Sequence, residues 1–94
     1  LQGWLCVCAH APRVAARTPL VLVVHCHDAG RTSNTTRLLA AAVRGTVLVR
    51  HGERPAPADP ASRVPAGTTP LVLFPGHGAR ALTPELVAAL PAPP

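Results

Sequence analysis

Apolar residues gather into three short runs along the chain, within residues 20–25, 46–50 and 71–74. Each run is rich in leucine and valine and is bounded by proline, glycine or polar residues. Apolar residues that follow one another, instead of alternating with polar ones, are typical of strands buried on both faces in a parallel sheet. The pattern therefore predicts three strands.

A helix is expected between the first two strands. Residues 27–33 are polar and contain a glycine, which predicts a loop, and the helix should begin at about Asn34 with Ser33 or Asn34 as its N-cap. Gly45 stands where a helix commonly ends on a residue in the left-handed conformation. The apolar face of this helix consists of residues at helical spacing: Leu38, Leu39, Ala42 and Val43.

A second helix is expected near the carboxyl end of the sequence. Thr83 is a suitable N-cap, Pro84 suits the first helical position, and Glu85 lies near the positive end of the helix dipole. The helix should run through Leu90. Residues 51–69 hold four prolines and two glycines without periodicity, which predicts a long flexible loop.

The order of these elements predicts the fold class. Short parallel strands separated by helices define an α/β fold, here a partial parallel sheet with flanking helices in the order strand, helix, strand, loop, strand, helix. The chain divides into an irregular leader at residues 1–19 and an α/β domain at residues 20–94.

Composition and charge narrow the range of partners. The 94 residues include nine arginines and no lysine, against four acidic residues, so the formal net charge is +5. Such a surface attracts phosphate, although arginine without lysine is also what GC-rich coding produces. The longest apolar run, residues 20–24, is far shorter than the roughly 18 residues of a membrane span, and no signal peptide is evident. We therefore expect a cytoplasmic protein with no membrane partner.

Three cysteines raise the question of a metal. Cys6 and Cys8 are two residues apart, so both thiolates can reach one ion, but a closed zinc site needs four ligands. An odd cysteine count without a sign of secretion argues against a disulfide scaffold, and two unligated or redox-labile thiols are the alternative reading. Further candidate ligands are Cys26, His10, His25 and His27.

The first predicted strand is followed at once by residues with reactive side chains, from His25 to Asp28. Ligands of open α/β sheets gather at the carboxyl ends of the strands. Histidine and aspartate at this place suit acid–base work or a divalent metal. The alternative is a polar loop that only caps the strand.

The beginning of the first predicted helix suits an anion. Free backbone amides there, beside the polar side chains of Ser33, Asn34 and Thr35, suit a carboxylate or phosphate, and Arg37 adds a guanidinium that can form two hydrogen bonds. Ordinary helix capping explains the same residues. The segment 74–78 follows the third predicted strand, and its two glycines permit either a close ligand approach or a tight turn. Neither a P-loop, nor a dinucleotide fingerprint, nor a serine nucleophile elbow is present.

Together and in order, these motifs resemble the DTW-domain family. The resemblance implies an incomplete SPOUT-like domain and transfer of the 3-amino-3-carboxypropyl group of S-adenosylmethionine to a uridine of tRNA. The matching landmarks are residues 5–9, 25–28, 33–38, 73–75 and 81–82.

The sequence departs from the family pattern in several places. Cys26 stands where the family usually has proline, and Asp28 where it usually has glutamate. The family's Cys-x-Cys normally follows another cysteine pair, so residues 1–19 resemble the remnant of a zinc-binding segment. The Asp-Thr-Trp motif would lie on a strand after Leu90. We expect an amino-terminal half that is inactive alone, with its catalytic residue elsewhere.

Two function hypotheses follow. The first is a tRNA-modifying transferase that binds S-adenosylmethionine and tRNA, with zinc at Cys6 and Cys8. The second is a non-catalytic basic RNA-binding or zinc-binding module. The substrate-binding residues that the resemblance implies are His25, Asp28, Ser33, Asn34, Thr35, Arg37, Phe74 and Pro75.

Overall fold

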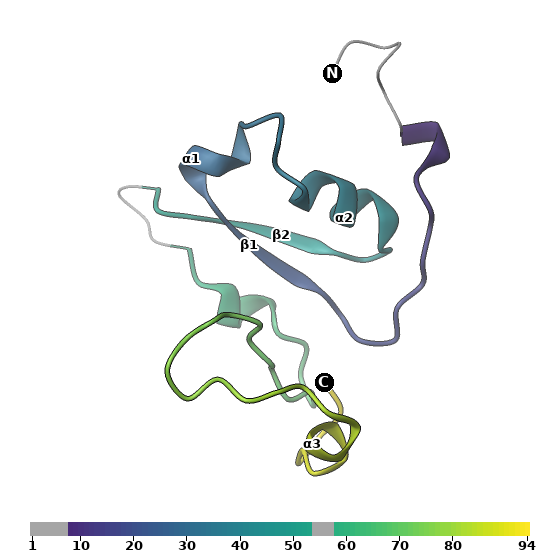
Figure 1. Cartoon of the computed structure of the whole chain (residues 1–94), viewed down its shortest axis with the longest axis vertical. Helices are drawn as coiled ribbons and strands as arrows, with labels where there is room; N and C mark the ends of the chain where they lie inside the picture. Colours follow the sequence, from purple (N-terminus) through teal and green to yellow (C-terminus); the bar gives the residue numbers. More distant parts are fainter. Residues whose placement is uncertain (1–7, 54–57) are drawn as a thin grey trace. The chain divides into compact units, whose positions relative to one another are not determined.

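The computed structural model describes residues 8–53 and 58–94, which fall into two compact units divided between residues 63 and 64. We call them the amino-terminal unit and the carboxyl-terminal unit, and each is described by itself (Figure 1).

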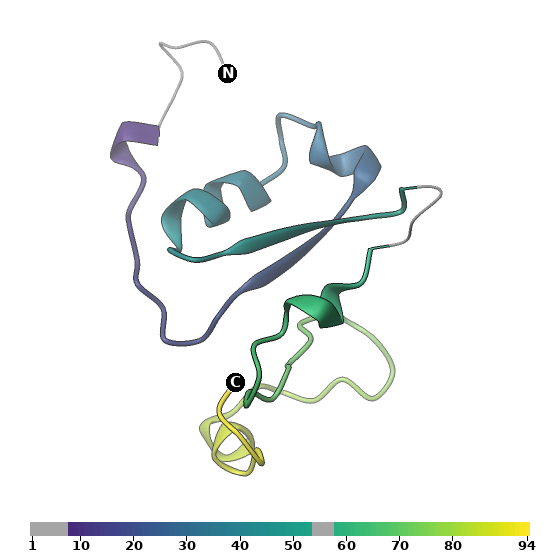
Figure 2. The same cartoon turned by 180° about the vertical axis from the view of Figure 1, so that it is seen from behind.

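A two-stranded parallel sheet forms the centre of the amino-terminal unit. Strand β1 spans Val21–His25 and strand β2 spans Val47–His51. The register places His25 opposite His51, and both strands run in the same direction (Figure 2). Two of the three predicted strands are therefore confirmed. Because the strands are parallel, their carboxyl ends meet at one edge of the sheet.

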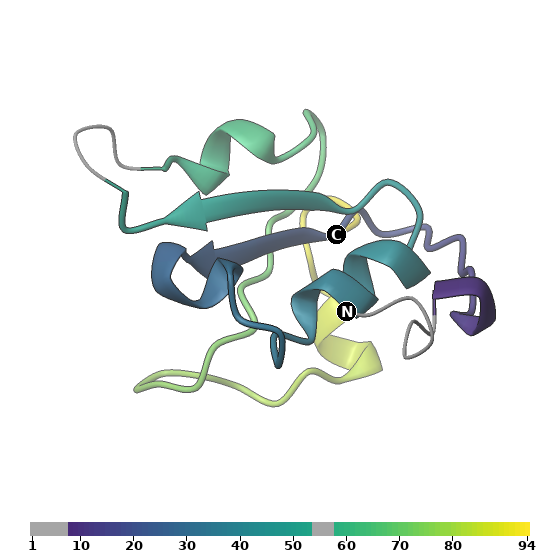
Figure 3. The same cartoon turned by 90° about the horizontal axis from the view of Figure 1, so that it is seen from above.

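Two α-helices follow β1 before the chain enters β2. Helix α1 spans Cys26–Ala29 and helix α2 spans Thr36–Ala42. Figures 1 and 3 place α2 over one face of the sheet. A 3-10 helix at Pro60–Arg63 contacts β1, so the segment predicted as a long loop is partly ordered.

The core of the amino-terminal unit is small. Val24, at 5% exposure, is the only buried apolar residue in the described part of the chain. Its neighbour Val23 is 51% exposed, because successive side chains of a strand point to opposite faces. A sheet of two strands buries little apolar area, so the hydrophobic contribution to the stability of this unit is small.

The leader is attached to the end of α2. After a 3-10 helix at Cys8–His10, Val14 forms an isolated parallel bridge with Val43. The Val14 amide donates to the Ala42 carbonyl at 2.6 Å, and the Arg44 amide donates to the Val14 carbonyl at 3.0 Å. The expectation of an irregular leader omitted this bridge, which pairs residues far apart in the sequence.

Helix α3, Pro84–Ala88, lies in the carboxyl-terminal unit and confirms the predicted start of the second helix. The Thr83 hydroxyl accepts a hydrogen bond from the Leu86 amide at 3.2 Å, and proline occupies the first turn. The helix ends before Leu90. Thr69 joins the unit's two ends, because its hydroxyl donates to the Ala92 carbonyl at 2.8 Å.

The start of the first predicted helix was wrong by two residues. Neither Ser33 nor Asn34 is the N-cap; Thr35 is, without a hydrogen bond from its side chain. The Asn34 side chain instead accepts from the Thr36 amide at 3.0 Å, from the position just before the N-cap. Gly45 does adopt the left-handed conformation (φ 74°), but in the turn after the helix.

The loop predicted at residues 27–33 was also partly wrong, because its first residues belong to α1. The side chain of His25, at the N-cap of that helix, accepts from the His27 amide at 3.3 Å. Histidine is not among the residues preferred at this position, so no capping signal marked the start of α1.

The third predicted strand is wrong. Residues 71–74 have no regular structure, and Val72, Leu73 and Phe74 are 86%, 81% and 76% exposed. A strand requires a neighbour that accepts and donates its backbone hydrogen bonds. No strand is present among the described residues of the carboxyl-terminal unit to act as that neighbour. The chain nevertheless has the predicted α/β class, with a partial parallel sheet.

Candidate functional site

A polar pocket lies in the segment that joins β1 to α2. Its volume is about 260 Å³. Its lining combines both signs of charge with amide and hydroxyl groups, all contributed by residues within eight positions of one another in the sequence: Asp28, Arg31, Ser33, Asn34 and Thr35. Four of these five residues were predicted as site residues from the sequence, and they are brought together.

Asn34 organises the pocket. Its side-chain amide donates to the Asp28 carbonyl at 2.8 Å, which holds the end of α1. Its side-chain oxygen accepts from the Thr36 amide at 3.0 Å and also from the Thr36 hydroxyl. One half-buried side chain thus connects α1 to α2 and fixes the path of the loop between them.

Arg31 is the lining residue that sequence reasoning missed. Its Nε atom lies 3.5 Å from Asp28 Oδ1, and the two side chains are 69% and 54% exposed. An exposed ion pair at this distance is weak, so a charged ligand can break it at little cost and pair with Arg31 or Asp28 instead. The only sequence signal was its position within the polar run between the first strand and the first helix.

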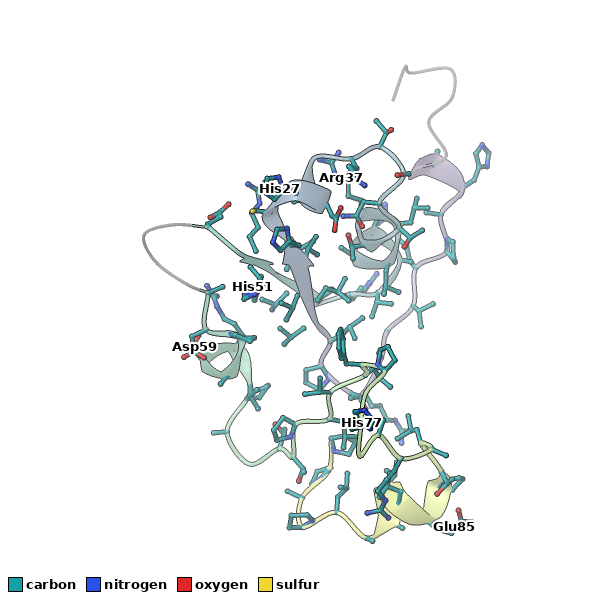
Figure 4. The ribbon with its side chains drawn as sticks, turned by 60° about the vertical axis from the view of Figure 1, so that its left-hand side comes forward. His27, Arg37, His51, Asp59, His77 and Glu85 are labelled. Carbon is teal, nitrogen blue, oxygen red and sulfur yellow. The ribbon has the colours of Figure 1, made fainter. Side chains whose placement is uncertain are left out.

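Arg37 lies on α2 outside the lining of the polar pocket. Its guanidinium Nη2 donates to the Ala29 carbonyl at 3.2 Å, which ties α2 to the end of α1. Figure 4 labels Arg37 together with His27, which belongs to α1. A guanidinium has five N–H donors, so most of them are available to an anion.

Three histidines gather at the same sheet edge. The rings of His25 and His27 are stacked, with centroids 5.2 Å apart, and the ring of His51 meets that of His25 edge-on at 6.2 Å. Cys26 lies between the first two in the sequence. The candidate ligand atoms of His25, Cys26 and His27 all lie within 4.8 Å of one another. This group could hold a metal ion.

A second, apolar cavity adjoins the polar pocket. It has a volume of about 580 Å³, and Thr35 lines both cavities. Leu38 and Leu39, predicted as the apolar face of the helix, are 49% and 41% exposed in it. The cavity's other lining residues are His10, Ala11, Pro12, Thr36 and Ala42.

Comparison with known families shows which family the chain belongs to. A family model described as the DTW domain matches residues 2–90. The chain belongs to the DTW family. Its polar pocket contains the first three residues of the Ser-Asn-Thr-Thr-Arg-Leu motif that carried the resemblance, and the family is related to tRNA modification. No curated protein and no solved structure matches the chain.

Some predicted site residues of this DTW domain do not join the polar pocket. Phe74 and Pro75 belong to the carboxyl-terminal unit, where both are exposed. Cys6 and the side chain of Cys8 lie outside the described part of the chain. Cys26 is half-buried with a free thiol. None of the helices that the structure describes has the length and apolar composition to cross a membrane.

Gly52 gives the DTW domain room for His25. It has a φ of 86°, and a Cβ atom at this position would lie 2.6 Å from His25 Nε2. We expect Gly52→Ala to lower the free energy of unfolding by about 1 to 2 kcal/mol, because alanine is strained at positive φ and its methyl group would displace the imidazole. Urea unfolding followed by circular dichroism measures this change.

Gly30→Ala is the matched control. Its added Cβ would meet nothing within 4 Å, and Gly30 has a φ of −89°. We expect this variant to be within about 0.5 kcal/mol of the parent. Equal stability of the Gly52 and Gly30 variants would contradict the close approach of Gly52 to His25.

Proposed function

We propose that this DTW-family chain acts in the transfer of the 3-amino-3-carboxypropyl group of S-adenosylmethionine to a uridine of tRNA. The observation that carries the proposal is the family match over residues 2–90. In this reaction uridine N3 attacks the γ-carbon of the methionine moiety, the bond from that carbon to sulfur breaks, and methylthioadenosine leaves. A base takes the N3 proton. We place the reaction in the cytoplasm.

The polar pocket suits the amino acid end of the donor. That end carries a carboxylate and an ammonium, and the pocket offers a guanidinium on Arg31 and a carboxylate on Asp28. The weak contact of 3.5 Å between them can be replaced by one ion pair to each charged group of the ligand. A volume of about 260 Å³ suits this part of the donor and not the whole molecule.

The apolar cavity suits a flat aromatic ring. It continues from the polar pocket at Thr35 and presents Leu38 and Leu39. Adenine or uracil can bury an apolar face against such side chains while the charged end of the donor stays in the polar pocket. The two cavities together therefore match the division of S-adenosylmethionine into a charged end and a flat end.

Several further roles belong to this proposal. The exposed guanidinium of Arg37 contributes to anion binding, and the net charge of +5 favours tRNA as a partner. His25, at the end of β1, is assigned to substrate binding with the family's first motif, and Phe74 and Pro75 are assigned to it with the family's later motif. Residues 1–19 act as the leader, a remnant of a zinc-binding segment, and residues 20–94 as the amino-terminal part of a DTW-type α/β domain.

Zinc at Cys6 and Cys8 is also part of the proposal. Two thiolates supply half of the four ligands that a closed site needs, so these residues alone do not complete it. The donor chemistry nevertheless fits, because thiolate is a preferred zinc ligand. The ion would fix the leader and would take no part in proton transfer.

Mass spectrometry of tRNA nucleosides tests the reaction. The protein translated from the full reading frame that encodes this chain is incubated with unmodified tRNA and with S-adenosylmethionine labelled in either the carboxyl or the methyl group. We expect aminocarboxypropyl-uridine with the carboxyl label and none with the methyl label. Transfer of the methyl label would contradict this proposal and would show that the protein is a methyltransferase.

Arg31→Gln tests the polar pocket within that enzyme. We expect the KM for S-adenosylmethionine to rise on the order of tenfold, because a charge-assisted hydrogen bond to the donor carboxylate is lost. Thr32→Ala is the matched control, since Thr32 lies in the same loop but outside the pocket lining. An unchanged KM in the Arg31 variant would show that the polar pocket does not bind S-adenosylmethionine.

A further inference from the structure

We propose that His25, Cys26 and His27 form a binding site for a zinc-class divalent cation, separate from Cys6 and Cys8. Their candidate ligand atoms lie within 4.8 Å of one another, and all three residues are at the carboxyl end of β1. The site therefore lies at the sheet edge next to the polar pocket, whose lining begins at Asp28.

The donor set selects the class of metal. Two imidazole nitrogens and one thiolate are ligands for Zn²⁺ and its spectroscopic substitute Co²⁺, whereas Mg²⁺ and Ca²⁺ prefer oxygen. Three protein ligands leave one position of a tetrahedral ion for water or a small molecule. The sequence without structure did not distinguish this set from the other candidate ligands, because it does not show which of them meet.

The geometry is close to that of a metal-bound site. With metal–ligand bonds of about 2.0 to 2.3 Å, the donor atoms of a tetrahedral site are roughly 3.3 to 3.8 Å apart. The observed limit of 4.8 Å therefore requires a movement of about 1 Å. His25 and His27 are exposed and Cys26 is half-buried, so rotation of the two imidazoles supplies this movement without unfolding the sheet.

The contacts of His25 identify its ligand atom. Nε2 faces Gly52, because a Cβ on that glycine would lie only 2.6 Å away. Nδ1 faces α1 and accepts from the His27 amide at 3.3 Å, a longer distance than the usual one of about 2.9 to 3.0 Å. An ion at Nδ1 replaces this weak hydrogen bond. Gly52 thus positions the ring with Nδ1 toward Cys26 and His27.

Titration with Co²⁺ under reducing conditions tests the site. The chain contains three cysteines, so in the double variant Cys6→Ser/Cys8→Ser every thiolate–cobalt bond must involve Cys26. We expect this variant to bind about one Co²⁺ per chain with a thiolate-to-cobalt charge-transfer band, and Zn²⁺ to displace the cobalt. Absence of the band would overturn the proposal.

Two further substitutions in the same background test the other ligands. Cys26→Ser should abolish the band, and His27→Gln should weaken Co²⁺ binding at least about tenfold. His51→Gln is the matched control, because His51 lies beside His25 but outside the group of ligand atoms. Equal losses in the His27 and His51 variants would overturn the three-residue assignment. Circular dichroism of each apo-protein identifies variants that fail to fold. If His27→Gln does not fold, His27→Cys takes its place, and this variant should still bind Co²⁺ because it keeps three ligands.

Discussion

Replacing Arg37 by alanine is expected to lower kcat/KM for tRNA modification by the full-length protein roughly 30-fold, which corresponds to about 2 kcal/mol. The expected cause is loss of a charge-assisted hydrogen bond from the guanidinium to the donor carboxylate or a tRNA phosphate. The kcat and KM values, measured separately for S-adenosylmethionine and tRNA, show which substrate the side chain contacts.

The same substitution should change stability by less than about 1 kcal/mol. It removes one exposed hydrogen bond of 3.2 Å to the Ala29 carbonyl, but it also removes a cation from the first turn of α2, where the helix dipole disfavours positive charge. Arg37→Lys should restore part of the activity, because a point charge does not reproduce two parallel hydrogen bonds. Arg44→Ala, just after α2, is the matched control. Clear destabilisation with kcat/KM intact would make Arg37 a structural residue.

Replacing Asn34 by alanine is expected to lower the free energy of unfolding by about 2 to 3 kcal/mol. Asn34 donates to the Asp28 carbonyl and accepts from two groups of Thr36, and each lost hydrogen bond costs about 1 kcal/mol. Because these bonds connect α1 to α2, we also expect faster amide hydrogen exchange at the start of α2. Urea unfolding and exchange measured by NMR test both effects.

Two substitutions separate the contributions of Asn34. Asn34→Asp keeps an acceptor for Thr36 and loses only the donor to Asp28, so it should be less damaging than alanine. Ser33→Ala is the matched control, because Ser33 lines the same pocket and makes no side-chain hydrogen bond within the described residues. If the Ser33 and Asn34 variants lose equal stability, the hydrogen bonds of Asn34 do not hold the loop.

Features that depend on neighbouring residues were predictable from the sequence. β1 and β2 follow from runs of leucine and valine, whose preference for a pleated, buried surface acts within a few residues. The start of α3 follows from Thr83 and Pro84, because an N-cap hydroxyl and a proline at the first position act within one turn. The resemblance to the DTW family likewise depended on short motifs.

Features that depend on distant residues were not predictable. Residues 71–74 have the composition of a strand, but pairing requires a neighbour that composition does not supply. The sequence also did not show whether Asn34 would cap α2 or connect it to α1, because asparagine can act in either way. Local propensity sets the candidates, and long-range contacts choose among them.

The candidate site shows the same division. The five lining residues of the polar pocket meet because they lie within eight positions of one another in the sequence. By contrast, His51 and Gly52 meet His25 only because the parallel register of β1 and β2 aligns positions 25 and 51. The register of a strand pair depends on both strands and on the helix between them, so no single motif could have placed these two residues beside His25.

The exposed segment 71–74 also bears on the behaviour of the protein at high concentration. Four consecutive apolar residues without charge, and with no strand partner among the described residues, are a template for pairing with the same segment of another molecule, which is how intermolecular β-aggregates begin. Pro70 and Pro75 flank the segment on both sides. Since proline has no amide hydrogen to donate, these two residues keep any such pairing short and act as gatekeepers against fibril growth.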